Sequence, residues 1–328
     1  MKNKFGKAAY VLTSVCLLVG VFGGCGTANS TETANSSKAD SVSSNVSSAS
    51  SEVKQLVAVG AENEYADIIS QIGGQYVSVT GIMSNPETDP HTYEADTKDA
   101  ALVGKAALVV ENGLGYDDFM DKLISGSPNA NRTVINVAKE LKYSDDTPNP
   151  HLWFQPNTMP KVAELVAQAL EKQMPEQKQT FEDNLSKFKN SLSAWTDKIA
   201  ALKKADGGVG VAVTEPVSDY LVEAAGLANK TPWAYQAAVM NGTDPAPQDV
   251  KTQQDLFSNK TIKVFLYNQQ AVDDSTKALL ELAQKNKIPV VGVYETMPTN
   301  YTYQKWMEAE TTAIQNAIEK GVSTEELK

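Results

Sequence analysis

Short β-branched runs alternate with amphipathic helical segments along most of the chain. Strands are predicted at 56–59, 76–79, 107–110, 133–137, 209–213, 262–266 and 289–293. Helices are predicted at about 63–72, 97–104, 116–124, 217–225, 273–286 and from 303 onward. Such alternation is typical of a parallel sheet with helices on both faces. We therefore expect an α/β fold.

The middle of the chain carries a longer helical pattern. A helix opened by Pro160 ends at Pro175, and the residues after it repeat apolar positions at alternating spacings of four and three: Phe181, Leu185, Phe188, Leu192, Trp195, Ile199 and Leu202. An uninterrupted helix over 176–204 would be about 40 Å long. The repeat is compatible with a coiled-coil dimer seam, but one such helix inside an α/β chain favours a helix that crosses both halves of a monomer.

These patterns predict the domain organisation. We expect an N-terminal α/β lobe at 53–175, a long linking helix at 176–205 and a C-terminal α/β lobe at 206–328. Each lobe should contain a mostly parallel sheet flanked by helices. The length that remains after the N-terminal segments is ample for two lobes.

The first 24 residues are typical of a secretory signal, with three lysines followed by a short apolar stretch. Val21-Phe22-Gly23-Gly24-Cys25 resembles a bacterial lipobox, which predicts lipidation of Cys25, although Phe22 stands where leucine is usual. An ordinary cleaved signal peptide and an uncleaved anchor are the alternatives. Residues 25–52 are rich in Ser and Thr and predict a disordered tether. We expect a protein anchored by lipid to the outer face of the cytoplasmic membrane.

Charge and cysteine content exclude several classes. Removal of the signal and its three lysines takes the formal net charge from −11 to −14. So acidic a body argues against binding nucleic acid, whose phosphates need Lys and Arg. No cysteine follows Cys25, so intrachain disulfides and thiolate metal ligands are excluded. The chain also lacks the Gly-x-x-x-x-Gly-Lys-Ser/Thr loop that holds nucleotide phosphates.

The two histidines of the chain occur in copies of one local pattern. Asp89-Pro90-His91-Thr92-Tyr93 and Asn149-Pro150-His151-Leu152-Trp153 both place histidine after proline and two residues before an aromatic residue. Histidine is the commonest metal ligand among side chains. A repeated pattern favours one shared purpose, namely a single metal ion held between two lobes. The alternative is a structural role for each histidine, and Tyr93 and Trp153 are expected to pack the loops.

Two carboxylates follow strands of the second half directly. Glu215 follows 209–214 and Glu295 follows 290–294. Ligands of open α/β sheets bind beyond the carboxyl ends of the strands, so His91, His151, Glu215 and Glu295 are the predicted metal ligands. Glu215 could instead serve only the helix that follows it, and Glu295 could be a solvated loop acid. Other nearby acids, Glu94, Asp96 and Glu111, are expected to face solvent or to lie behind the ligands.

At these residues the chain resembles the extracytoplasmic solute-binding receptors of bacterial zinc and manganese ABC importers. Asp89-Pro90-His91-Thr92-Tyr93-Glu94 is similar to the first ligand motif of that family, Asn149–Trp153 to the second, and Glu215 with Tyr220-Leu221 to the third. The fourth family ligand is commonly Asp after the last strand. Here Glu295-Thr296 occupies that region only if a small deletion is assumed, and Met297 stands at the ungapped position. The resemblance implies a separate permease and ATPase as partners.

The ligand set leaves the choice of metal open. Two imidazoles and two carboxylates suit tetrahedral Zn²⁺, whereas bidentate carboxylates would give the higher coordination that Mn²⁺ accepts. A third histidine or a His-rich loop, frequent in zinc receptors, is impossible here, which favours manganese, although zinc generally binds a given site more tightly.

Two other functions remain possible at this point. A surface zinc-dependent hydrolase would need an open coordination position and a base, and the chain contains no His-Glu-x-x-His helix. A receptor for a small organic solute would need an aromatic cavity, to which Trp233 and Tyr235 could contribute. We expect a binding protein and not an enzyme.

Overall fold

The structure is a computed structural model that describes residues 55–85 and 93–327. The predicted signal, Cys25, the whole Ser/Thr-rich segment at 25–52 and His91 lie outside the described residues. All described residues belong to one compact unit.

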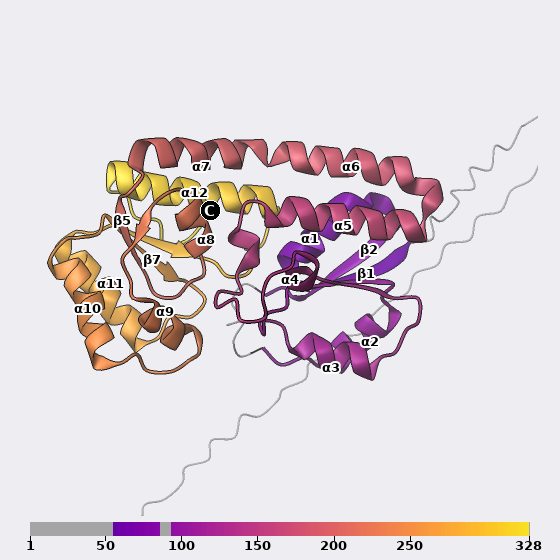
Figure 1. The fold of residues 1–328 in the computed structure, drawn as a ribbon, viewed down its shortest axis with the longest axis horizontal. Helices are drawn as coiled ribbons and strands as arrows, with labels where there is room; N and C mark the ends of the chain where they lie inside the picture. The colour runs from indigo at the N-terminus through magenta and orange to yellow at the C-terminus, as the bar shows by residue number, and fades with distance from the viewer. Residues whose placement is uncertain (1–54, 86–92, 328) are drawn as a thin grey trace, which may run out of the picture. The chain divides into compact units, whose positions relative to one another are not determined.

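Two four-stranded sheets form this unit, and all their strand pairs are parallel (Figure 1). Sheet A has the order β2-β1-β3-β4 and contains β1 (Leu56–Glu62), β2 (Val77–Met83), β3 (Leu108–Glu111) and β4 (Thr133–Asn136). Sheet B has the order β6-β5-β7-β8 and contains β5 (Gly210–Val213), β6 (Ala228–Asn229), β7 (Val264–Asn268) and β8 (Val290–Val293). We call the parts built on these sheets the first and second lobes. The predicted α/β fold with two lobes is confirmed.

The strand order reverses at the same place in both sheets. The chain moves outward from β1 to β2 and then returns to β3 on the other side of β1, and it does the same around β5. Ligands bind at such switch points in open α/β sheets. In this protein the switch points lie at the carboxyl ends of β1 and β3 in sheet A and of β5 and β7 in sheet B.

Helices cover both faces of each sheet. In the first lobe, α1 (Asn63–Gly73), α5 (Thr158–Gln173) and α6 (Lys178–Ser191) lie on one face, and α2 (Thr97–Lys105) and α3 (Phe119–Gly126) on the other. In the second lobe, α7 (Ser193–Asp206), α8 (Asp219–Ala224) and α12 (Tyr303–Lys320) lie on one face, and α9 (Trp233–Met240), α10 (Pro247–Ser258) and α11 (Asp274–Asn286) on the other. Short pieces complete the fold: α4 (Val137–Glu140) and three 3₁₀ turns, at Gly74–Tyr76, Leu152–Phe154 and Pro175–Gln177.

The strands divide their side chains between these two helical layers. In β7, Val264 and Leu266 enter the core under α7 and α12, whereas Phe265 and Tyr267 enter the core under α10 and α11. This division follows from the two-residue period of a strand. Because both faces are buried, the strands read as continuous apolar runs, as parallel strands do.

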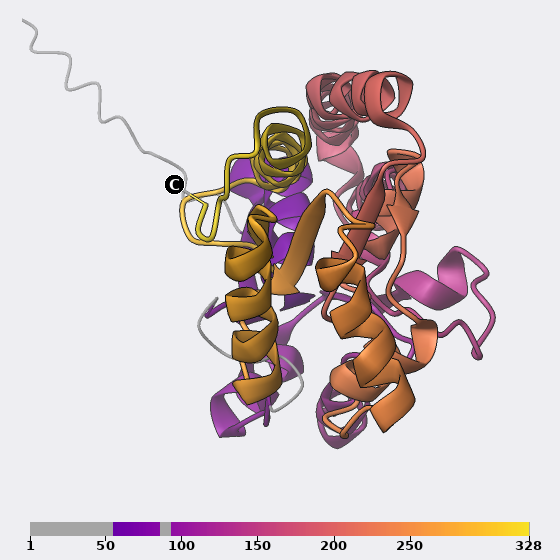
Figure 2. The same cartoon turned by 90° about the vertical axis from the view of Figure 1, so that its left-hand side faces the viewer.

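The long linking helix is present as α6 and α7, which continue each other along the top of both lobes in Figure 1. At Leu192 the helix tightens locally, since the backbone N–H of Leu192 donates to the carbonyl of Lys189, three residues earlier. The apolar stripe is buried within the chain, because Phe181, Phe188, Trp195 and Leu202 join the core shared with α5 and α12. Figure 2 shows α7 and α12 end-on beside each other. The stripe is thus an intramolecular packing surface and not a dimer seam.

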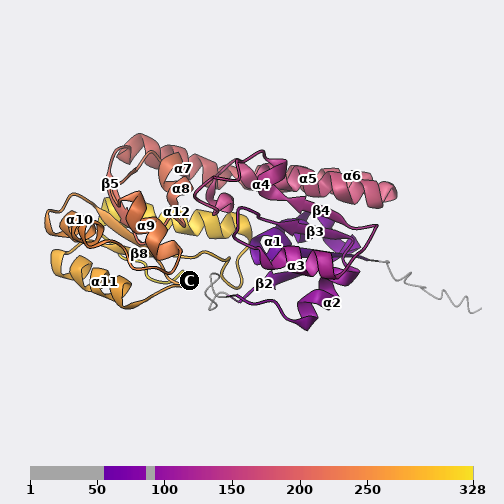
Figure 3. The same ribbon diagram turned by 60° about the horizontal axis from the view of Figure 1, so that its bottom comes forward.

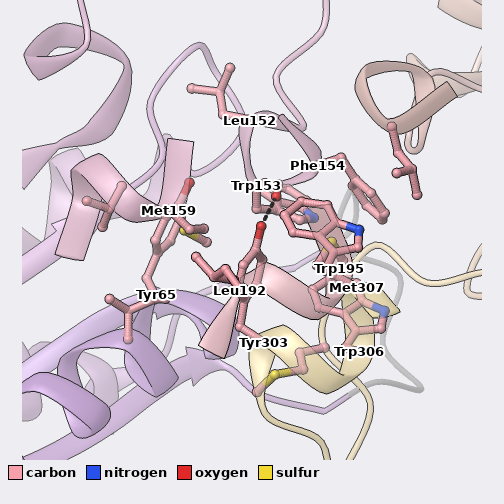
Figure 4. Close-up of a cluster of buried hydrophobic side chains, with 14 of the residues drawn as sticks. Tyr65, Leu152, Trp153, Phe154, Met159, Leu192, Trp195, Tyr303, Trp306 and Met307 are labelled. Carbon is pink, nitrogen blue, oxygen red and sulfur yellow. Dashed lines mark hydrogen bonds between the residues drawn. The ribbon is translucent and has the colours of Figure 1, made fainter. Parts of the chain in front are cut away.

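One apolar core runs through both lobes. Figure 4 shows the aromatic side chains at its centre, where Phe154 of the first lobe meets Trp306 of α12 with ring centroids 5.5 Å apart. Trp195 and Tyr303 pack edge to face at 5.9 Å. The Tyr303 hydroxyl donates to the carbonyl of Trp153 at 2.6 Å. Both apolar contacts and a buried hydrogen bond therefore hold the lobes together.

Part of the second lobe was not predicted. No element was expected between 226 and 261, where β6, α9 and α10 lie. Figure 3 labels α9 and α10. β6 contributes only two residues, each paired with β5, and so leaves no apolar run to recognise. α10 buries only Gln253 and Phe257, so its polar sequence lacks the apolar stripe that marks a packed helix. None of the helices in residues 55–85 and 93–327 is both long and apolar enough to cross a membrane.

Trp306→Ala should destabilise both lobes together. The indole is fully buried between them, and removing a buried tryptophan costs about 3–5 kcal/mol of unfolding free energy. Urea unfolding followed by tryptophan fluorescence and by far-UV circular dichroism should give one coincident transition at a lower midpoint. Trp233→Ala is the control, because Trp233 is 41% exposed and should change the free energy by less than about 0.5 kcal/mol. Two separate transitions in the parent protein would contradict a shared core.

Candidate metal centre

His151 is fixed in place by the residues that follow it. Leu152, Trp153 and Phe154 form a 3₁₀ turn whose side chains are all fully buried in the shared core. The imidazole itself is also fully buried and packs edge to face with Trp153 at 5.4 Å and with Tyr116 at 5.7 Å. The Pro-His-x-aromatic pattern thus anchors the loop through its aromatic residue, as expected for Trp153.

Asn149 sets which imidazole nitrogen is available. Its side-chain N–H donates to the carbonyl of Pro216 in the second lobe at 2.9 Å, so its oxygen must face His151. That oxygen accepts from the backbone N–H of His151 at 3.0 Å and lies 2.8 Å from Nδ1. An amide oxygen only accepts, so Nδ1 carries the proton and Nε2 is the atom presented to the site. Such an outer partner is the usual way in which a metal-ligating histidine is oriented.

Glu295 reaches the same point from the second lobe. It comes just after β8, separated from the strand by Tyr294, and is fully buried. Gln270 holds its backbone, since the amide oxygen accepts from the N–H groups of Glu295 at 2.6 Å and of Thr296 at 2.9 Å. Asn268, at the end of β7, donates to Glu295 Oε2 at 2.6 Å. This leaves Oε1 directed toward the first lobe.

His151 Nε2 and Glu295 Oε1 lie 2.9 Å apart. With Nδ1 protonated, a neutral imidazole and a carboxylate present two acceptors to each other, so a proton or another cation must lie between them. Two tetrahedral Zn²⁺ ligands with bonds of about 2.0–2.1 Å would be about 3.4 Å apart. The pair would need to separate by only about half an ångström to hold a metal ion, which is a small side-chain movement.

Glu215 lies beside the partners of this pair. It is buried at the carboxyl end of β5, between Thr214 and Pro216. The Thr214 hydroxyl accepts from the backbone N–H of Asn268 at 3.0 Å, and the Pro216 carbonyl accepts from Asn149. Glu215 is therefore flanked by residues bonded to the outer partners of both Glu295 and His151.

The surroundings of the pair are acidic. Burial raises the pKa of Glu64 to about 8 and that of Asp117 to about 7, and burial together with the charge of Asp117 raises the pKa of Glu62. The ion pairs that lysines make in the described part of the chain lie elsewhere, on α5–α7 and on α10–α12. Burial thus favours the neutral, protonated form of these acids, and a cation entering the interior would favour their ionisation.

The remaining residues singled out in the sequence lie apart from the pair. Asp96 caps α2 by accepting from the N–H groups of Lys98 and Asp99, and Glu94 is exposed. Tyr93 packs against Phe119 of α3 with ring centroids 4.9 Å apart, as expected for a loop-packing residue.

Glu111 and Met297 complete the set of candidates. Glu111 Oε1 accepts from Asn136 at the ends of β3 and β4, so this acid lies in the interior and does not face solvent. Met297, the ungapped alternative to Glu295, is buried, and its backbone pairs with Asn63. The structure thus brings Glu295, and not Met297, against His151.

Sequence reasoning gave no role to Asn149, Asn268 and Gln270. Asn149 stood inside a quoted motif, yet its function depends on a carbonyl 67 residues away. Asn268 ends β7 at the switch point of sheet B, so the rule that selected Glu215 and Glu295 could also have found it.

Within residues 55–85 and 93–327, no group of three or more His, Cys, Asp or Glu side chains is arranged to hold a metal ion. Of the four predicted ligands, His151 and Glu295 are in contact, Glu215 lies nearby, and His91 lies outside the described residues.

A known protein family matches most of the chain. Residues 59–317 match the family described as "ZnuA: Zinc-uptake complex component A periplasmic". The chain belongs to this family. The resemblance that the histidine motifs indicated is therefore confirmed, and ZnuA-family proteins are extracytoplasmic solute-binding components of metal importers, not enzymes.

Curated relatives agree with the ZnuA assignment. The chain is 26% identical over 246 residues to the manganese-binding lipoprotein MntA of Bacillus subtilis, covering 71% of this chain and 77% of that protein. It is 24% identical over 260 residues to the metal ABC transporter substrate-binding lipoprotein ScbA of Streptococcus cristatus, covering 76% and 82%.

Solved structures share the fold. The Mn-bound periplasmic metal binding protein of Candidatus Liberibacter asiaticus superposes with a TM-score of 0.67 at 19% identity, covering 80% of this chain and all of that one. A crystal structure of ZnuA gives a TM-score of 0.66 at 19% identity, covering 81% and 100%.

Glu310 of α12 is hydrogen-bonded to the backbone of the loop that carries Glu295. Its Oε1 accepts from the backbone N–H of Tyr294 at 2.9 Å and from the Trp306 indole at 3.0 Å, and burial raises its pKa to about 8. The folded protein therefore binds this proton more tightly than the unfolded chain, where the ordinary value is 4.5. The stability that the proton contributes is complete below pH 4.5 and is lost as the pH rises toward 8.

Glu310→Gln should reduce this pH dependence, because the amide mimics the protonated acid and cannot ionise. In metal-free buffer, the loss of unfolding free energy between pH 5 and pH 8 should be smaller in the variant than in the parent, as measured by urea midpoints. Glu308→Gln, on the same helix but 44% exposed, is the control and should follow the parent. Identical pH profiles for all three proteins would contradict the raised pKa.

Proposed function

We propose that this protein captures one divalent transition metal ion, Mn²⁺ or Zn²⁺, between its lobes and delivers it to an ABC permease driven by a separate ATPase. The observation that carries the proposal is the contact between His151 Nε2 and Glu295 Oε1, which come from opposite lobes and lie 2.9 Å apart. Both groups are fully buried and both are oriented by amide side chains. A metal ion would take the place of the proton between them.

We infer that His91, His151, Glu215 and Glu295 are the ligands. The imidazoles and the two carboxylates would come from different lobes, so an ion bound to all four would join the lobes. Two carboxylates offset the charge of a divalent cation, which lowers the cost of burying it. The buried acids Glu62, Glu64 and Asp117 would ionise more readily with a cation bound nearby, because its charge opposes the effect of burial on their pKa values.

The ligand atoms suit either metal. Two nitrogens and two oxygens fit tetrahedral zinc, and carboxylates that bind through both oxygens would provide the larger coordination number of manganese. Among the relatives, MntA is named for manganese and TroA of Treponema pallidum for zinc. The absence of any third histidine favours manganese for this chain.

We also propose that lipidated Cys25 holds the protein at the outer face of the cytoplasmic membrane, with residues 25–52 as the tether. Several relatives are named as lipoproteins, which supports this reading of the N-terminal segment. The body would act as a monomer, since the apolar stripe of α6 and α7 is used within the chain.

Loss of a ligand should remove most of the metal affinity. In calorimetric titrations of the metal-stripped protein with Mn²⁺ and with Zn²⁺, the parent should bind one ion. The variants His91→Ala, His151→Ala, Glu215→Gln and Glu295→Gln should each weaken binding by more than 100-fold. Asn149→Ala, which removes only the outer partner of His151, should weaken it by roughly 10- to 100-fold.

Two controls make the ligand test specific. Met297→Ala should leave affinity within about twofold of the parent, which separates Glu295 from the ungapped alternative. Glu308→Gln should have no effect, because this exposed acid lies on α12 away from the pair. Undiminished binding in both His151→Ala and Glu295→Gln would exclude the proposed site.

Metal affinity should fall as the solution becomes acidic, because imidazole must be deprotonated to bind a metal. Between pH 7.5 and pH 5 we expect a loss of roughly 10- to 100-fold, with proton release on binding detected by titrations in buffers of different ionisation enthalpy. A pH-independent affinity without proton release would rule out ligation by histidine.

A further inference from the structure

Asn63 connects the first lobe to the loop that carries Glu295. Its side-chain N–H donates to the carbonyl of Met297 at 2.6 Å, and its side-chain oxygen accepts from the N–H of Met297 at 3.0 Å. The two residues are 234 positions apart in the chain. The amide thus pairs with both polar groups of one residue, as a neighbouring strand would.

This pairing attaches the loop to a different lobe from the one to which Gln270 attaches it. Gln270 belongs to the second lobe and binds the backbone of Glu295 and Thr296, whereas Asn63 belongs to the first lobe and binds the next residue. Asn63 thus attaches the backbone of this loop to the first lobe through two hydrogen bonds. The loop therefore spans the two lobes, with Glu295 two residues from the first-lobe attachment.

The chemistry at position 63 requires an amide. Only an amide can donate to a carbonyl and accept from an N–H in this planar arrangement, because a carboxylate lacks the donor and a hydroxyl is too short to reach both groups. Asn63 is the first residue of α1, but its side chain makes its hydrogen bonds to Met297 and not to the helix end, where Glu62 is the N-cap. Both polar groups of the half-buried amide therefore bind the loop.

We propose that Asn63 is a positioning residue for the metal ligand Glu295. By fastening the Glu295 loop to α1, it makes the ligand geometry depend on the closed arrangement of the lobes. An ion bound between His151 and Glu295 can leave more easily when this connection is lost. The proposal rests on the proposed metal-binding function of Glu295.

A second amide pair provides a matched control. Gln71 lies eight residues further along α1 and forms reciprocal side-chain hydrogen bonds with Gln304 of α12 at 3.0 and 2.7 Å. This pair also joins the first lobe to the second, but it does not touch the loop 294–298. Loss of Gln71 therefore measures the effect of weakening the contact between lobes without disturbing Glu295.

The test compares Asn63→Ala and Gln71→Ala in the full chain, with Mn²⁺, Zn²⁺ and the spectroscopic probe Co²⁺. Asn63→Ala should weaken binding of each metal by roughly 10- to 100-fold, the range for loss of an outer-shell partner, and chiefly by faster dissociation. It should also shift the visible absorption bands of bound Co²⁺, which report coordination geometry. Gln71→Ala should keep the affinity within about twofold and leave the Co²⁺ spectrum unchanged.

Asn63→Asp is the second variant if Asn63→Ala does not fold. It keeps the acceptor for the Met297 N–H but loses the donor and adds a charge beside Glu62 and Glu64, so the same weakening is expected. Equal effects of Asn63→Ala and Gln71→Ala, or an unchanged Co²⁺ spectrum in Asn63→Ala, would overturn the positioning role. Glu295→Gln distinguishes failure of the Asn63 proposal from failure of the metal site. If Glu295→Gln abolishes binding while Asn63→Ala has no effect, only the role of Asn63 is wrong. If Glu295→Gln has no effect, the proposed metal site is wrong as well.

Discussion

The two lobes share one apolar core, and the geometry of the candidate metal centre depends on it. Trp153 and Phe154, which follow His151, are buried against α12, whose residues Trp306 and Tyr303 belong to the second lobe. The same turn that anchors this core therefore fixes the backbone of His151. An imidazole from one sheet and a carboxylate from the other can then be held 2.9 Å apart in a position that neither lobe could define alone.

Hydrogen bonds orient the side chains where the two lobes meet, whereas the apolar core holds the lobes together. Each amide at the site is oriented by a backbone group that can only donate or only accept a hydrogen bond. The Pro216 carbonyl only accepts, so the N–H of Asn149 points to Pro216 and its oxygen points to His151. Asn268 is fixed in the same way, because its oxygen accepts from the N–H of Gln270 and its nitrogen must then donate to Glu295. Apolar contacts are not directional, so these hydrogen bonds decide which atoms face the ion.

The interior also contains buried acidic side chains, which destabilise the fold but suit the binding of a cation. Glu62 and Glu64 are fully buried at the end of β1 and the start of α1, and burial raises the pKa of both. Burying carboxylates without cationic partners costs stability. Their position at the switch point of sheet A, beside the His151–Glu295 pair, is consistent with a site that receives a cation.

The sequence by itself determined the class of fold and the first candidates for the site. Apolar runs predicted seven of the eight strands, because parallel strands buried on both faces are continuous in sequence, and the spacing of Phe181, Phe188 and Trp195 predicted the long helix. Tertiary structure alone decided that Glu295 and not Met297 faces His151, and that Asn149, Asn268 and Asn63 orient or hold the loops. The physical reason is that these roles depend on hydrogen bonds across up to 234 residues of chain. A local pattern records which side chains are buried, but it carries no information about which distant carbonyl or N–H group each one will meet.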